Sequence, residues 1–152
     1  MALIIDSTAA TISVVVSKDS AVNCSEEEYD EYLKDLDESH LNLEGEPTRF
    51  VLRKNLPYEA SQRVMDAQAS YVKGQVKMQM SYVLEEVRAS LVDIINPDDL
   101  PKEKQLIYKR HNDGLCSKEI IGLLQSYGVL MDLYRARSNF TSGPKGDIIK
   151  KK

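Results

Sequence analysis

The sequence predicts an α+β fold that is mainly α-helical, and three observations support this. Two short runs, residues 11–16 and 48–53, are rich in β-branched and aromatic residues, which favour strands. From residue 58 onward the apolar residues recur at steps of three to five, which is typical of helices. At 152 residues and with no repeated segment, the chain has the size of one domain. We therefore expect a small β element ahead of a helical body.

The first seventeen residues are predicted to be extended. Residues 3–5 form a short apolar run, and residues 11–16 are β-branched almost throughout. The intervening Asp6-Ser7-Thr8 suits a turn. Two arrangements remain open: a β-hairpin over about residues 3–17, or an extended arm that pairs with another subunit.

The next segment is acidic and predicts a helix. Residues 1–47 hold twelve acidic residues against two basic ones, a local net charge of −10, whereas residues 48–152 carry a net charge of +6. Ser25 and Glu28 have the spacing of a capping box, which predicts a helix start. An apolar stripe follows at helical spacing and consists of Tyr29, Tyr32, Leu33 and Leu36.

The body is predicted as one strand followed by three helices. The strand spans residues 48–53, and a long helix from about 58 to 95 follows, with a weak point at Gly74. A short helix begins near Pro101 and ends by Gly114, and the last begins after Ser117 and continues past Gly128. We expect three regions: an acidic N-terminal region (1–47), a helical body (48–140) and a basic flexible tail (141–152).

The residues that could carry chemistry match no known arrangement. Cys24, His40, His111 and Cys116 are ligand types for zinc, but their spacing fits no compact metal motif. His111 and Cys116 could form a base and a nucleophile, yet no glycine-rich oxyanion loop accompanies them, and phosphate-binding glycine patterns are absent. We therefore predict no catalytic residue, no cofactor and no metal. The start lacks the pattern of a signal peptide, and no run is long enough to span a membrane.

From residue 48 onward the chain resembles small assembly proteins of tailed bacteriophages, in particular tail assembly chaperone-like sequences. Three stretches carry this resemblance: residues 49–59 (RFVLRKNLPYE), residues 87–93 (VRASLVD) and residues 113–119 (DGLCSKE). The resemblance covers about two thirds of the chain and implies a structural role without enzymatic chemistry. It also implies a location in a virion or in the cytoplasm of an infected cell.

We therefore expect a non-enzymatic protein that binds other protein subunits, as a homo-oligomer or within a larger assembly, without membrane or direct nucleic-acid binding. Charge would set the register, with the acidic segment meeting basic surface of another copy or partner. The expected acidic contacts are Glu26, Glu27 and Glu28, and the expected apolar anchors are Tyr29, Tyr32 and Leu36. The expected basic contacts are Arg49, Arg53, Lys54 and Arg63. The alternative is an acidic, DNA-mimic-like regulator that occupies a nucleic-acid-binding host protein.

Overall fold

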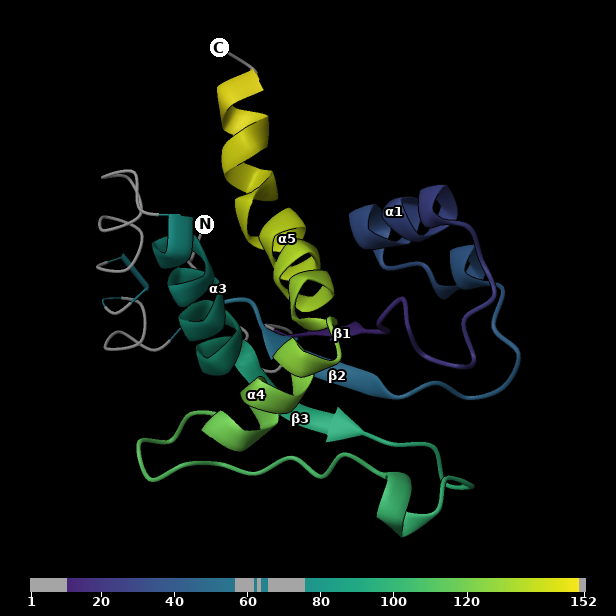
Figure 1. Cartoon of the computed structure of the whole chain (residues 1–152). Coiled ribbons are helices and arrows are strands. Elements are labelled where there is room, and N and C mark those ends of the chain that lie inside the picture. Colours follow the sequence, from purple (N-terminus) through teal and green to yellow (C-terminus); the bar gives the residue numbers. More distant parts are fainter. Residues whose placement is uncertain (1–10, 57–61, 63, 66–75, 151–152) are drawn as a thin grey trace, which may run out of the picture.

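The computed structural model describes residues 11–56, 62, 64–65 and 76–150. In chain order these contain strand β1 (Thr11–Val14), helix α1 (Glu26–Asp35), 3-10 helix η1 (Glu38–Leu41), strand β2 (Arg49–Arg53), helix α3 (Val76–Ser90), strand β3 (Leu91–Ile95), 3-10 helix η2 (Lys102–Lys104), helix α4 (Lys118–Ser126) and helix α5 (Leu130–Lys150). Figure 1 shows this order along the chain. The predicted α+β, mainly helical class is confirmed. Residues 3–10 of the expected hairpin, and Gly74 within the expected long helix, lie outside the described residues.

The three strands form one antiparallel sheet in the order β1-β2-β3. β1 lies at one edge and pairs with β2, with Ile12 opposite Leu52 and Val14 opposite Phe50. These four side chains are all buried, because alternate residues of a strand face the same side of the sheet. The predicted strands at residues 11–16 and 48–53 are thus confirmed over residues 11–14 and 49–53, and they pair with each other.

Strand β3 corrects the prediction of one helix from 58 to 95. α3 ends at Ser90, whose buried hydroxyl donates to the carbonyls of Glu86 and Val87, and the chain passes directly into β3. Leu91 and Ile94 are three apart, which is a helical spacing. A bulge opposite Val51 and Leu52 inserts one extra residue, so both still reach the buried face. Because of the bulge, the apolar spacing of this strand is the same as that of a helix end.

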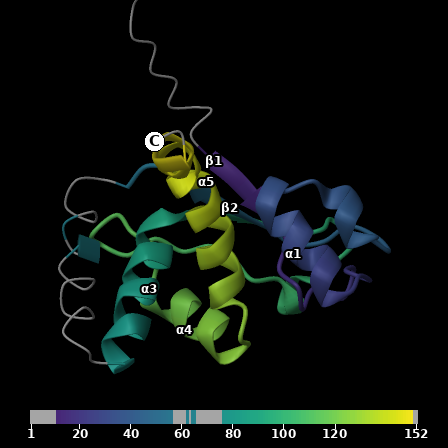
Figure 2. The ribbon, with the colours of Figure 1, turned by 90° about the horizontal axis from the view of Figure 1, so that it is seen from above.

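The helices lie over one face of this sheet. α3 and α5 lie side by side above the strands, α4 packs beneath them, and α1 flanks α5 on its other side, as Figures 1 and 2 show. A single apolar cluster joins them, to which Val14, Leu33, Val87, Leu124 and Leu133 all belong. Residues on both sides of position 47 share this core, so the change in charge there is not a boundary in the packing.

Three further expectations about the second half are corrected. The segment predicted as a helix from Pro101 to Gly114 contains only η2. Ser117 caps α4 as predicted, but the helix ends at Ser126 with Tyr127 as its C-cap, and Gly128, with φ +73, turns the chain toward α5. α5 then runs to Lys150, although residues 141–150 were expected to be flexible. Its composition offers no physical reason for this, since Gly143, Pro144 and Gly146 all disfavour helix.

Candidate functional site: an acidic face and its groove

Helix α1 is anchored at both ends by its own sequence. The Ser25 hydroxyl accepts a hydrogen bond from the Glu28 backbone N–H at 3.2 Å, and the Glu28 carboxylate accepts one from the Ser25 N–H at 3.0 Å. This confirms the predicted capping box. At the other end Leu36 adopts a left-handed conformation (φ 55), and its N–H donates to the Tyr32 carbonyl. The helix is therefore held as a defined unit of ten residues.

The apolar stripe of α1 is used inside the chain. Tyr29 and Tyr32 are 5% and 0% exposed, and Leu36 is half-buried against the same core. The Tyr29 hydroxyl donates to the Val15 carbonyl at 2.8 Å, and the Val15 N–H donates to the Tyr32 hydroxyl at 2.8 Å. Burial raises the pKa of Tyr32 to about 12. The structure thus places both predicted tyrosine anchors in this protein's own core, and a partner that reaches α1 meets its other side.

That other side consists of carboxylates. We define the acidic face as the exposed acidic residues of α1 and of the turn after it: Glu26, Glu27, Glu28, Asp30, Glu31, Asp35 and Asp37. The one basic residue of α1, Lys34, lies among them and pairs with Glu31 at 3.1 Å. The predicted acidic contacts therefore do lie on the surface, and they belong to a larger set.

Local hydrogen bonds favour the ionised form of three carboxylates of this face, Glu28, Asp35 and Asp37. The pKa of Glu28 is lowered because the Ser25 backbone N–H and hydroxyl bond to its carboxylate. The Asp37 N–H and the His40 ring likewise lower the pKa of Asp35, and the Ser39 N–H lowers that of Asp37. These carboxylates therefore remain charged at neutral and mildly acidic pH.

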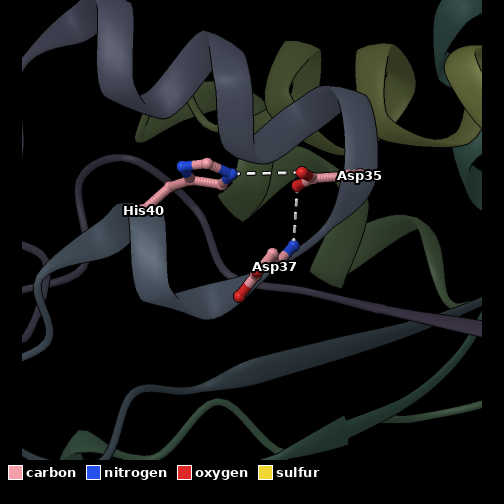
Figure 3. A group of neighbouring side chains, drawn as sticks. All are labelled: Asp35, Asp37 and His40. Carbon is pink, nitrogen blue, oxygen red and sulfur yellow. Dashed lines mark hydrogen bonds and ion pairs between the residues drawn. The ribbon is translucent and has the colours of Figure 1, made fainter.

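Asp35, Asp37 and His40 lie close together at the end of the acidic face (Figure 3), with ligand-type atoms within 4.8 Å of one another. Asp35 accepts hydrogen bonds from the Asp37 N–H at 2.9 Å and contacts His40 Nε2 at 3.1 Å. Asp37 accepts from the Ser39 N–H at 3.0 Å and so caps η1. These hydrogen bonds explain why the three side chains lie together: they form a capped turn between α1 and η1.

The predicted basic contacts have different surroundings. Arg49 binds Glu38 at 2.7 Å and Glu46 at 2.9 Å, so it meets acidic residues of its own chain. Arg53 is the last residue of β2 and Lys54 follows it, and the carbonyls of both accept hydrogen bonds from Arg137. The Lys54 ammonium lies 6.0 Å from the centre of the Phe140 ring. Arg63 lies outside the described residues.

A groove runs between α1 and α5, which Figure 2 shows side by side. It has two hollows, of about 530 Å³ near the start of α1 and about 390 Å³ further along. The Asp30–Arg135 ion pair, at 2.7 Å, joins the two helices and lines both hollows. The first hollow, which we call the α1 hollow, is also lined by Cys24, Glu26 and Asp132.

Asp132 is a buried carboxylate in the wall of the α1 hollow. It is 8% exposed and accepts two hydrogen bonds from Ser17, one from the backbone N–H at 2.9 Å and one from the hydroxyl at 2.8 Å. Among the described residues it takes part in no ion pair. No local motif marks Asp132 in the sequence, because its partner Ser17 lies 115 positions away.

The four residues considered as zinc ligands do not form a metal-binding group among the described residues, and the thiol of the possible catalytic pair, Cys116, is buried. Within the described part of the chain, no three of Cys24, His40, His111 and Cys116 bring ligand atoms within 4.8 Å of one another. Cys116 is fully buried, and its desolvation raises the pKa of the thiol to about 12. This thiol is therefore protonated at neutral pH, whereas a cysteine nucleophile reacts as the thiolate.

Comparison with known proteins adds no relative. No protein-family model, curated protein or solved structure matches the chain. Among the residues that the structure describes, no helix combines the length and apolarity that crossing a membrane requires.

Proposed function

We propose that this protein is a non-enzymatic binding protein whose acidic face docks onto a basic surface of another protein subunit. The observation that carries this proposal is that the two sides of α1 differ: its inner side packs in the core and its outer side is charged. Its tyrosines pack in the core and hold the helix in place, so its outward side presents six exposed carboxylates, and Asp37 in the turn after it adds a seventh. Such a surface attracts positive charge over a distance and raises the rate and selectivity of association.

The basic surface belongs to a partner or to a part of a second copy other than Arg49. Arg49 already makes two ion pairs with Glu38 and Glu46, and Arg135 pairs with Asp30. These arginines neutralise the flanks of the acidic segment from within the chain. They do not reach Glu27 or Glu31, which stay exposed, with only Lys34 paired to the latter.

The setting we propose is the building or decoration of a tailed-phage particle, in the virion or in the host cytoplasm. The sequence resemblance from residue 48 onward supports this setting. The fold suits such a role, since one core holds the sheet and helices together while the acidic face stays on the outside. In an assembly, charge contacts of this kind set register and association rate more than affinity.

A regulator that imitates DNA is a second candidate, and the composition of the outward side favours it. The α1 residues that face away from the core are charged, and the tyrosines that could fill an apolar groove on a partner are buried. Carboxylates at regular helical spacing can occupy the phosphate contacts of a nucleic-acid-binding protein. Both candidates require a basic partner and differ in what that partner is.

A defined basic probe tests the shared element of both candidates. We expect the peptide acetyl-(Gly-Arg)4-amide to bind the full chain, and Glu27→Gln with Glu31→Gln to weaken this binding by about three- to tenfold at 50 mM salt, because two exposed charges are removed. Fluorescence anisotropy of labelled peptide measures it. The matched control is Glu103→Gln with Glu119→Gln, two exposed carboxylates outside the acidic face. Equal weakening by the control pair would contradict a docking role for the acidic face.

Two further measurements separate the candidates. In the DNA-mimic case the protein releases labelled duplex DNA from a basic, sequence-independent DNA-binding protein, and the Glu27→Gln, Glu31→Gln variant does not. In the case of assembly from copies of this chain, sedimentation at 50 mM salt shows oligomers that dissociate at 500 mM. A 17.2 kDa species at both salt concentrations argues against self-assembly.

A further inference from the structure

The α1 hollow indicates which part of a basic partner is recognised. We propose that it is a binding site for one basic side chain, a lysine or an arginine, of the partner protein. This inference rests on the proposed function and adds a specific contact to it: the acidic face attracts the partner, and the hollow receives one of its cationic groups.

The shape of the site suits a side chain. The hollow measures about 530 Å³ and lies open to solvent, between α1 and α5. Glu26 and Asp30 line it from α1, whereas Asp132 and Arg135 line it from α5. Pockets of this size are common binding sites, and a lysine or arginine side chain is long enough to place its charge beside the inner wall.

The charge of the lining selects a cation. Asp30 and Arg135 bind each other at 2.7 Å and cancel, which leaves the carboxylates of Glu26 at the rim and Asp132 at the wall. An anionic ligand would meet two like charges, and Arg135, the cation that lines the hollow, is already paired with Asp30. An ammonium or guanidinium group meets two carboxylates instead.

The Ser17 contacts do not explain why residue 132 carries a charge. Both Ser17 bonds end on one carboxylate oxygen of Asp132, so an asparagine amide oxygen could accept them equally well. Position 132 also lies in the first turn of α5, whose dipole favours a negative charge. That dipole and the two Ser17 bonds stabilise the carboxylate, and a cation in the hollow would add a charge-assisted contact that an asparagine could not make.

The test follows backbone amide shifts of the full ¹⁵N-labelled chain on titration with acetyl-Gly-Arg-Gly-amide. We expect saturable shifts at Cys24, Ser25 and Asp132, and none with the same peptide carrying neutral citrulline in place of arginine. Asp132→Asn should weaken binding about tenfold, since one charge-assisted contact is lost. Glu26→Gln is the second variant, because Glu26 is exposed and its replacement leaves the core intact.

The matched control is Glu119→Gln, an exposed carboxylate that, like Glu26, lies in the first turn of a helix, but outside both the acidic face and the hollow. It should leave the shifts at Cys24 and Asp132 unchanged. If the amide shifts were confined to the acidic face and unaffected by Asp132→Asn and Glu26→Gln, the hollow would not be the binding site. The proposed function of the acidic face would still hold. Absence of saturable shifts would also overturn the hollow as a binding site, whereas the proposed function is judged separately with the longer, fourfold-charged peptide.

Discussion

Arginine side chains pair with carboxylates in two regions of the protein, with different consequences. We call the surroundings of α1, including Arg49 and Arg135, the front, and the surroundings of α3, including Arg88 and Arg137, the rear. At the front, the ion pairs of Arg49 and Arg135 join partly exposed side chains. At the rear, Arg88 and Arg137 are each 5% exposed and hold the structure together. Arg88 donates to the Cys116 carbonyl and to Asp113, and Arg137 contacts Glu86. The exposed ion pairs at the front can rearrange when a partner binds, whereas the buried arginines at the rear are needed to stabilise the fold.

The largest effect is expected at Arg137, compared with Arg135 two positions away on α5. Arg137→Met should lower the free energy of unfolding by about 3 kcal/mol, because it leaves the buried Glu86 carboxylate without its ion-pair partner. It also removes the donors to the carbonyls of Arg53 and Lys54. Arg135→Met breaks a pair that is about half exposed and should cost less than about 1 kcal/mol. Urea denaturation measures both, and similar losses would contradict the division into front and rear.

Glycine 128 lies at the joint between these regions and gives the next effect. The Lys18 ammonium from the front donates to the Tyr127 carbonyl at 3.0 Å, where α4 ends. Gly128 has φ +73, so Gly128→Ala should cost about 1–2 kcal/mol in backbone strain. The added Cβ would also lie 2.6 Å from the Lys18 ammonium, which can move aside because it ends a flexible side chain.

Gly122→Ala is the matched control for that substitution. Gly122 lies inside α4 with open space around it, so alanine there should stabilise the helix by up to about 1 kcal/mol. Thermal unfolding of both variants checks the expectation of opposite signs. A loss of stability at both positions would show that the left-handed turn is not the cause.

A smaller effect is expected from Glu38 at low pH. Arg49 lowers the pKa of Glu38, chiefly through their hydrogen bonds. A lowered folded-state pKa contributes stability that is present above the ordinary value of 4.5 and is lost as the pH falls through the folded value. Glu38→Gln should therefore lose less than about 1 kcal/mol at pH 7 and almost nothing near pH 2. Unfolding at both pH values measures this, and an equal loss at both would contradict the ion pair.

How well each region could be predicted depends on how far apart in the sequence the interacting residues lie. The front follows from short motifs: the Ser25 capping box and the stripe through Tyr29 lie within a few residues, and both are confirmed. The sequence could not show what the stripe packs against, because burial in the chain's own core and docking on a partner require the same pattern. Its side-chain spacing is identical in either case.

The features that could not be predicted depend on contacts between residues far apart in the sequence, which no local pattern encodes. Leu91 and Ile94 were assigned to a helix because their spacing is three, and only the bulge against β2 makes that spacing compatible with a strand. Asp132 escaped notice for a similar reason, since its importance comes from Ser17 and Glu26, which lie more than 100 positions earlier. Tertiary contacts overrode local preference in both cases.

The smallest effect is expected at His40, at the far end of the acidic face. Its pKa is raised above the ordinary value of 6.5, first by the hydrogen bond to Asp35 and further by the negative charges around it. A raised folded-state pKa contributes stability that is fully present below 6.5 and is lost as the pH rises through the folded value. We expect proton NMR to show His40 titrating above its value in the urea-unfolded chain. Asp35→Asn should move the titration back toward that value, whereas Glu103→Gln, outside the acidic face, should leave it unchanged. Identical titration in the folded and unfolded chain would mean that the carboxylates at this end are screened by solvent and salt, and that the acidic face attracts cations less strongly than its seven charges suggest.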